Sequence, residues 1–295
     1  MKRIITLTSL TLISTNYLLI FAHLLGANNY VYAFFPDSPQ QLTLFDKNGH
    51  VYNSECPNLD QVKDSSAISK KLALPFTLLN WNIYKQQNTT WQVKLQEWSE
   101  RADIITLQEA KHTQQLIDFS HLRNLNYYQN HAFNLNGYVY GVNTLSTSQV
   151  SHLCGTRYFE PWIQVPKTGL ATIYPIDKHQ QSLLVINLHG VNFTLTSTPL
   201  KEQLAPYFAL IEQHQGSVIF SGDFNTWSDA RLQYVENTLS IYGFEEAVFR
   251  HDQRSKVFGL PLDHVFFRGL KVISAESLAT DASDHSPQLV TFDIE

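Results

Sequence analysis

The residues with the clearest chemical potential lie in the segment Ser221–Asn225, which follows the apolar run Val218–Phe220. Asp223 and Asn225 are two positions apart, and side chains at this spacing on an extended segment point to the same side. Asp223 can orient or deprotonate a water molecule, while Asn225 can donate a hydrogen bond to a phosphoryl oxygen. Gly222 lets the backbone turn without a side chain in the way. Alone, such a segment is usually an Asx-rich turn, so the interpretation depends on other residues.

Three further polar residues stand where short apolar runs end: Asn82, Glu109 and His189. Ligands of α/β proteins bind beyond the ends of strands, so this recurrence favours one shared site. A buried Glu109 would be costly unless it were paired or bound to a cation, and Mg²⁺ takes few protein carboxylates beside water and phosphate oxygens. The alternative is a salt bridge from Glu109 to Lys111 or Arg101.

The C-terminal part of the chain contains a second group of acidic residues and histidines. Asp284 offers a metal carboxylate directly beside the imidazole of His285. Asp263 is the candidate for fixing the tautomer of that imidazole from another part of the chain. One Asp-His pair is usually part of an ordinary loop, so this signal gains weight only together with the others.

Short apolar or β-branched runs bounded by turn residues predict the strands that would position these groups. The predicted strands are Phe76–Trp81, Ile104–Leu107, Gly169–Tyr174, Leu183–Leu188, Val218–Phe220, Val265–Phe267 and Leu289–Phe292. Helical spacing predicts helices over Trp91–Arg101, Leu200–His214 and Asp229–Leu239. Strands that alternate with helices indicate an α/β protein, and two packed sheets flanked by helices would accommodate this many strands.

The composition indicates one large globular domain. Of 295 residues, 43% are hydrophobic and only 16% are charged, which supports a sizeable core and excludes a disordered chain. The formal net charge of −5 argues against a broad basic surface for nucleic acid, although carboxylates at a metal site contribute to it. The chain has no Gly-x-Ser-x-Gly elbow of a serine hydrolase.

The N-terminus has the pattern of an export signal. Lys2 and Arg3 precede an uncharged stretch from Ile4 to Ala33, so we expect residues 1–33 to be a signal peptide or a signal anchor. The alternative is a buried first helix. Residues 34–75 form a polar lead-in segment, and residues 76–295 form the domain. The protein is then expected to be periplasmic or secreted, or anchored to the membrane by its N-terminal segment.

The chain has two cysteines, Cys56 and Cys154. Export supplies an oxidising compartment in which they can form a disulfide, but free thiols are an open alternative. Neither cysteine has a Cys or His at the short spacing of a zinc site.

Taken in order, the polar blocks resemble the endonuclease/exonuclease/phosphatase superfamily, which includes deoxyribonuclease I, abasic-site endonucleases, inositol phosphatases and neutral sphingomyelinases. The resemblance extends from Phe76 to the C-terminus, and Trp81–Gln87 is similar to an uncharacterised bacterial subgroup. The matching blocks are Leu79–Ile83, Leu107–Glu109, Asn187–His189, Ser221–Asn225, Leu262–Val265 and Ser283–His285. The resemblance implies two packed, mostly antiparallel β-sheets flanked by helices, a four-layer α/β sandwich like that of deoxyribonuclease I.

The resemblance also implies a cofactor, Mg²⁺ or Mn²⁺. Glu109 matches the principal metal ligand of the family, with Asn82 beside it and Asp284 as a further ligand. One metal ion would screen the charge that develops during in-line attack on phosphorus.

The catalytic roles that the resemblance implies agree with those suggested by the residue types. Asp223 matches the residue that orients or deprotonates the attacking water, and Asn225 and His189 match groups that hold the scissile phosphate. His285 matches the histidine that stabilises the phosphoryl transition state, with Asp263 as its carboxylate partner.

We therefore expect a Mg²⁺-dependent phosphoesterase that hydrolyses phosphodiester bonds, with a nuclease as the first choice. The alternatives are a phospholipid or sphingomyelin phosphodiesterase, an inositol phosphatase, or a catalytically inactive binding module on the same fold. The expected partner is a phosphodiester substrate such as DNA or a phospholipid, and the protein is expected to be a monomer without an obligate protein partner.

The chain departs from the family pattern in two respects. No arginine follows Ser146, where many members have one, and neither Tyr138 nor Tyr140 has a decisive motif for the tyrosine of abasic-site endonucleases. Arg157 and Lys167 could contact a phosphate, but we expect each of them to be an ordinary surface charge.

Overall fold

The computed structural model describes residues 42–161, 163–194 and 196–295. The predicted signal segment, residues 1–33, lies outside the described residues. Of the helices in the described part, none has the length and apolar character that a membrane span requires.

The first sheet has eight strands, in the order β16-β17-β4-β5-β7-β6-β1-β2. Strands β4 and β5 are parallel, and the other neighbours in this sheet are antiparallel. Helix α3 (Trp91–Ser99) connects β4 to β5. In chain order the strands are β1 (Leu44–Asp46), β2 (Val51–Tyr52), β4 (Phe76–Asn82), β5 (Ile104–Lys111), β6 (Asn126–Leu135), β7 (Tyr138–Ser146), β16 (Leu270–Ser277) and β17 (Gln288–Ile294).

The second sheet has seven strands, in the order β12-β15-β11-β10-β9-β8-β3. Its one parallel pair is β10 and β11, which helix α5 (Thr198–Gln213) connects. In chain order the strands are β3 (Asp60–Gln61), β8 (His152–Phe159), β9 (Pro166–Pro175), β10 (Ser182–His189), β11 (Val218–Asp223), β12 (Glu245–Glu246) and β15 (Asp263–Arg268). A small hairpin of β13 (Lys256–Val257) and β14 (Leu260–Pro261) precedes β15.

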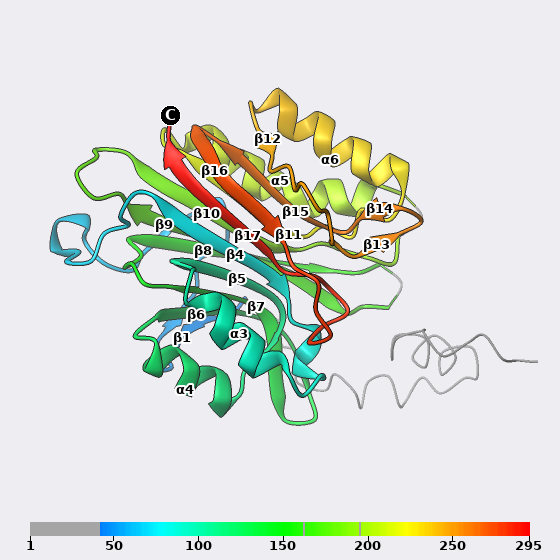
Figure 1. The fold of residues 1–295 in the computed structure, drawn as a ribbon, viewed down its shortest axis with the longest axis horizontal. Helices are drawn as coiled ribbons and strands as arrows, with labels where there is room; N and C mark the ends of the chain where they lie inside the picture. Colours follow the sequence, from blue (N-terminus) through cyan, green and yellow to red (C-terminus); the bar gives the residue numbers. More distant parts are fainter. Residues whose placement is uncertain (1–41, 162, 195) are drawn as a thin grey trace, which may run out of the picture.

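The two sheets stack face to face and helices cover their outer sides. Figure 1 shows α3 and α4 (Gln114–Leu122) along one side of the stack, and α5 and α6 (Asp229–Ile241) along the other. Alternation along the strands produces this layering, because Leu78 joins the core between the sheets while Leu79 joins the core under α3 and α4. Each such fully buried leucine contributes about 1.5–3 kcal/mol. The predicted four-layer α/β sandwich is confirmed.

All seven predicted strands and all three predicted helices are present, most with shifted ends. The sequence pattern missed four long strands, β6, β7, β8 and β16, and helix α4. Strand β6 contains tyrosine, asparagine, glutamine and histidine, yet most of its residues are buried. Because many of these residues are polar, β6 lacks the apolar run by which a buried strand is predicted from sequence. Its polar side chains can be buried because they find hydrogen-bond partners in the folded protein.

The lead-in segment contributes edge strands to both sheets. Strands β1 and β2 extend the first sheet, and β3 pairs with β8 in the second. Cys56 and Cys154 form a disulfide with a Cα–Cα distance of 5.1 Å, which ties this segment to β8 across 98 residues of sequence. Of the two alternatives for the cysteines, the structure contains the disulfide.

A buried polar layer joins the two sheets beneath one end of the stack. Gln108 of the first sheet donates from Nε2 to Oδ1 of Asn80 at 2.9 Å and to Oδ1 of Asn187, in the second sheet, at 2.8 Å. The hydroxyls of Thr106 and Ser221 lie 3.2 Å apart across the same interface. All five side chains are fully buried. Buried networks of this kind fix the relative position of the elements that carry them.

Candidate active site

The carboxyl ends of the two parallel strand pairs bring the predicted residues together. Asn82 is the last residue of β4, and His189 and Asp223 are the last residues of β10 and β11. The register pairs His189 with Asp223, and Asp223 with Asp263 at the start of β15. Because the sheets stack, the strand ends of one face those of the other, and Asn82 donates from Nδ2 to Oδ2 of Asp223 at 3.0 Å.

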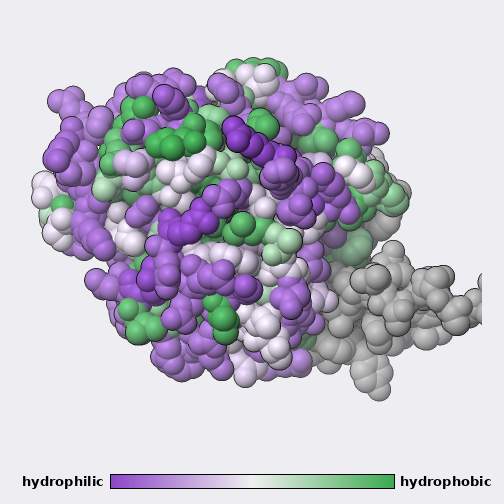
Figure 2. Space-filling model, viewed as in Figure 1, coloured by the Kyte–Doolittle hydropathy of each residue, from purple (hydrophilic) through white to green (hydrophobic). Residues whose placement is uncertain are grey.

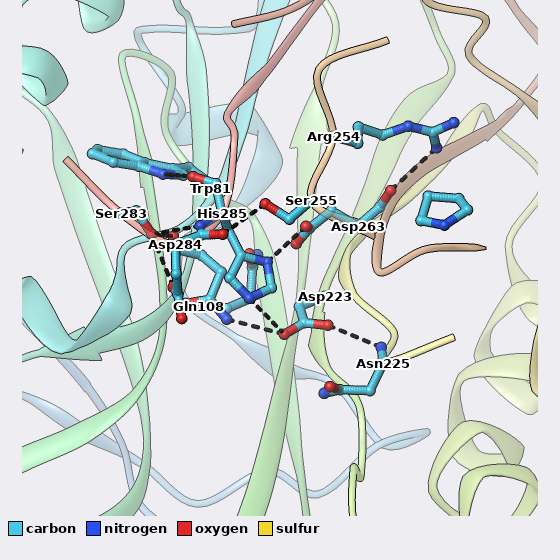
Figure 3. Close-up of polar contacts among 12 residues, drawn as sticks. Trp81, Gln108, Asp223, Asn225, Arg254, Ser255, Asp263, Ser283, Asp284 and His285 are labelled. Carbon is cyan, nitrogen blue, oxygen red and sulfur yellow. Dashed lines mark hydrogen bonds and ion pairs between the residues drawn. The ribbon is translucent and has the colours of Figure 1, made fainter. Parts of the chain in front are cut away.

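Asp223 lies at the centre of the site and is 2% exposed. Its Oδ1 accepts a hydrogen bond from the backbone N–H of Asn225 at 2.9 Å, and Figure 3 shows the carboxylate between Asn225 and the imidazole of His285. Burial, together with the charge of Asp263, raises the pKa of Asp223 to about 6, against the opposing effect of His285. A carboxyl group with this pKa is well matched to accepting a proton near neutral pH.

The turn after Asp223 depends on unusual backbone geometry. Gly222 has φ of 146°, and a Cβ at this position would lie 2.0 Å from the carbonyl oxygen of Leu188. Asn225 has φ of 52°, in the left-handed region that asparagine tolerates better than most residues. The side-chain amide of Asn225 donates to the carbonyl of Gly190 at 2.9 Å, so one N–H of this amide holds the turn. The second N–H is the one that can reach a phosphate.

His285 and Asp263 form a buried pair. His285 Nδ1 lies 2.7 Å from Oδ2 of Asp263, which is fully buried, and His285 Nε2 lies 3.9 Å from Oδ2 of Asp223 (Figure 3). Although burial alone lowers the pKa of the imidazole, the carboxylates of Asp263, Asp223 and Asp284 raise it to about 10. His285 is therefore an imidazolium at neutral pH, with Nε2–H directed toward the centre of the site.

Glu109 contacts a lysine that the sequence did not indicate. Nζ of Lys85 lies 2.5 Å from Oε2 of Glu109, and this ion pair holds the pKa of Glu109 far below its ordinary value although burial opposes it. The alternative partners were wrong, because Arg101 pairs with Glu276 and Lys111 lies over the ring of Tyr138. Lys85 occupies a short 3-10 turn, η2 (Tyr84–Gln86), directly after β4.

His189 contacts a second lysine. Nζ of Lys167 lies 2.7 Å from Nε2 of His189, while Nε2 is also 3.7 Å from Oδ2 of Asp223. Burial and the charge of Lys167 lower the pKa of His189 well below 6.5, so the neutral imidazole accepts the hydrogen bond on Nε2. The expectation that Lys167 and Arg157 are ordinary surface charges was wrong, since Arg157 is half-buried and donates to the carbonyl of Ala132.

The three predicted metal ligands offer oxygen donors, as Mg²⁺ and Mn²⁺ prefer. Glu109 is largely buried, Asp284 lies on the exposed side within electrostatic range of Glu109 and Lys85, and Asn82 supplies an amide oxygen. Two carboxylates and one amide oxygen form a donor set that fits a divalent cation, which would displace Lys85 from Glu109. A second arrangement, Asp223, Asp263 and His285, has ligand atoms within 4.8 Å of one another. The short bond from His285 to Asp263 makes a paired imidazolium the better description of that group.

A pocket opens beside these residues. Its polar wall consists of Lys85, Glu109, Lys167, His189 and Glu160, the residue that follows β8. Neither Lys85 nor Glu160 was predicted to belong to the site: Lys85 lies in the segment Trp81–Gln87 but was given no role there, and Glu160 lies outside the matching blocks. Only the fold places them beside the strand ends.

Several solved structures share this fold. ANGEL2, a 2′,3′-cyclic phosphatase, covers 81% of this chain and 98% of its own with a TM-score of 0.61 at 13% identity. An endonuclease/exonuclease/phosphatase from Bacteroides vulgatus covers 75% of this chain and 99% of its own with a TM-score of 0.59 at 15% identity. At such low identity these likenesses concern the fold alone.

Residues 79–285 match the Endonuclease/Exonuclease/phosphatase family, and the chain belongs to this family. Among curated proteins it is 40% identical to a UPF0294 protein of Vibrio vulnificus (strain YJ016) over 262 residues, which is 87% of this chain and 88% of the relative. It is also 40% identical to a UPF0294 protein of Erwinia tasmaniensis over 217 residues, 74% of this chain and 81% of that one. The predicted resemblance, including the bacterial subgroup, is confirmed.

Proposed function

We propose that this protein is a metal-dependent hydrolase of phosphodiester bonds that acts on nucleic acid or another nucleotide diester. The family to which the chain belongs consists of phosphoesterases, including nucleases and phosphatases. The observation that carries the proposal is the position of Asp223, a buried carboxyl group that Asn82 orients between His285 and His189. A water molecule beside Asp223 would meet a proton acceptor on one side and phosphate-binding groups on the other.

Each of these residues has a distinct role in the proposed reaction. Asp223 orients the water and accepts its proton as the bond from the water oxygen to phosphorus forms. The ester P–O bond on the opposite side breaks, and the leaving alkoxide takes a proton from solvent. His285, kept protonated by Asp263, donates from Nε2 to a phosphoryl oxygen as negative charge develops, and the free amide N–H of Asn225 does the same. Lys167, which also donates a hydrogen bond to His189, holds another oxygen of the phosphate. A divalent cation held by Glu109, Asp284 and Asn82 would neutralise charge on the substrate.

Two comparisons support a nucleotide substrate over the lipid and inositol alternatives. The ANGEL2 structure is a complex with adenosine-2′,3′-vanadate, and a similar structure of D. rerio TDP2 is a complex with a single strand DNA product. The net charge of −5 is compatible with such a substrate, since Lys85, Lys167 and His285 concentrate positive charge at the site itself.

The test uses the full chain with bis(4-nitrophenyl) phosphate, plasmid DNA, sphingomyelin and inositol phosphates assayed side by side. We expect hydrolysis of the generic diester and of DNA in Mg²⁺ or Mn²⁺, and loss of activity in EDTA. Asp223→Ala should lower kcat by about 10²–10⁴-fold. Asp118→Asn, on the exposed surface of α4, is the matched control. Activity that persists in EDTA or in the Asp223 variant would contradict the mechanism, and inactivity on every substrate would favour a binding module.

We further propose that the protein is exported and acts as a monomer in the periplasm, outside the cell or at the membrane. The basic start and the uncharged stretch Ile4–Ala33 support export, and the disulfide between Cys56 and Cys154 is typical of an oxidising compartment. N-terminal sequencing of the mature protein tests cleavage, because a soluble cytoplasmic product that begins at Met1 would contradict export. Light scattering of the purified protein tests the monomer.

A further inference from the structure

The pocket beside the site has a second, apolar wall. With its part open to solvent it comprises about 470 Å³ of empty space. The rings of Phe133 and Tyr140 stack there, with centroids 5.2 Å apart and an angle of 13° between their planes. The apolar wall consists of Phe133, Tyr140, Ile163, Val165, Pro166 and Phe193. A bound phosphate at His189 and Lys167 would therefore carry its organic group into a space with aromatic and aliphatic sides.

One oxygen atom of a carboxylate in this pocket lacks a well-formed hydrogen bond. Glu160 is fully buried, and its Oε1 accepts a hydrogen bond from the backbone N–H of Asn192 at 2.6 Å. Its Oε2 has no hydrogen bond of normal geometry among the atoms of the described chain, although Glu160 lines the pocket and the backbone N–H of Phe193 and the charge of Lys167 also favour its carboxylate. A buried acceptor without a partner costs free energy in the empty pocket, and a donor on a ligand would remove that cost.

This combination of walls discriminates between classes of organic group. A lipid chain would fill the apolar side but would leave Oε2 of Glu160 desolvated and unpaired. An inositol ring would satisfy Glu160 but would place its other hydroxyls against Phe133 and Tyr140. A nucleoside has a flat apolar face for aromatic side chains and N–H or O–H donors on its edge, so it matches both walls.

We propose that this pocket is a nucleoside subsite, in which Oε2 of Glu160 accepts a hydrogen bond from a base N–H or a sugar hydroxyl of the substrate. The inference rests on the proposed phosphodiesterase function and specifies its substrate. The stacked pair of Phe133 and Tyr140 provides the surface for the flat face, and Lys167, positioned by its hydrogen bond to His189, anchors the adjoining phosphate. Glu160 is then a specificity residue for the group beside the scissile bond.

The test compares two diesters with the same leaving group, thymidine 5′-(4-nitrophenyl phosphate) and bis(4-nitrophenyl) phosphate, of which only the first carries donors. The wild-type protein should have the higher kcat/KM for the thymidine ester. Glu160→Gln replaces the acceptor with an amide that can present N–H, and the ratio of the two kcat/KM values should fall about tenfold, mainly through KM of the thymidine ester. Phe133→Leu should lower the same ratio. Glu100→Gln, an exposed glutamate after α3, is the matched control and should leave it unchanged.

The outcomes separate the subsite from the proposed function. An equal loss on both diesters in Glu160→Gln would mean that Glu160 only holds the loop at Asn192, and the subsite would be refuted. A higher kcat/KM for 4-nitrophenylphosphorylcholine than for the thymidine ester would also refute it, in favour of a lipid substrate. If no diester is hydrolysed in a manner that depends on Asp223, the proposed function itself fails.

Discussion

A divalent cation that binds Glu109 would compete with Lys85 for its carboxylate. Removal of the Lys85 charge should therefore raise the affinity of the protein for the cation. The Lys85 and Glu109 side chains are only 21% and 15% exposed, so their ion pair is shielded from water. Hydrogen bonds to charged groups contribute about 1.5–3 kcal/mol, and a metal that binds Glu109 must first displace Lys85. Lys85→Met removes that cost, so Mn²⁺ should bind about 10–150-fold more tightly. Lys85→Arg keeps the charge and should retain weak binding.

Isothermal titration with Mn²⁺ measures this affinity without recourse to activity, and thermal unfolding provides a second measurement. In EDTA, Lys85→Met should unfold at a lower temperature, because Glu109 loses its partner, at a cost of up to about 3 kcal/mol. Added Mg²⁺ should then raise the unfolding temperature of this variant more than that of the wild type. Lys94→Met, which breaks an exposed ion pair with Glu97, is the control. Equal or weaker metal binding by Lys85→Met would refute the competition.

Three further predictions concern the catalytic carboxylates and the disulfide. Asp263→Asn should lower the pKa of His285 from about 10, so kcat should fall by about 10²–10⁴-fold. The loss of kcat should deepen as pH rises above about 7, because His285 then loses its proton. A loss that does not depend on pH would count against the role of His285 as an imidazolium. Burial raises the pKa of Asp223 to about 6, so activity should decline on acidification. The apparent pKa of this decline should be about 6 or lower, because a bound cation favours the carboxylate. A flat pH–rate profile down to pH 4 would be incompatible with Asp223 as the proton acceptor. The double variant Cys56→Ser/Cys154→Ser should lose about 4 kcal/mol of unfolding free energy in urea titrations, and unchanged stability would show that the 98-residue tether adds nothing.

The sequence was most informative where strand ends coincide with chemistry. Asn82, His189 and Asp223 stand at the carboxyl ends of apolar strands, and the stacked sheets bring them within hydrogen-bond or ion-pair distance of one another. The pairing of His285 with Asp263 also followed from the residue types, and the two lie 2.7 Å apart. These groups were predictable because each follows an apolar run in the sequence, and the ends of those strands form the site.

The residues that were missed depend on long-range geometry. Lys85 reaches Glu109 only because β4 and β5 are adjacent and the turn η2 has positive φ angles. Lys167 lies on β9, and its position beside His189 follows from the antiparallel pairing of β9 with β10. Glu160 is distinguished by its burial and its missing partner, which no spacing in the sequence expresses. Charged residues of this kind resemble surface residues until the fold assigns their neighbours.

The buried polar layer between the sheets has a consequence for the folding of the protein. Each parallel strand pair with its connecting helix supplies only part of the site: β4 and β5 provide Asn82 and Glu109, and β10 and β11 provide His189 and Asp223. Gln108 meets Asn187 directly beneath this junction, so neither half can complete its hydrogen bonds before the other docks. A partly folded chain would thus separate His285 from Asp263 and Asn82 from Asp223, and could not hydrolyse a substrate. Activity recovered during refolding would report the docking of the two sheets as a single cooperative event.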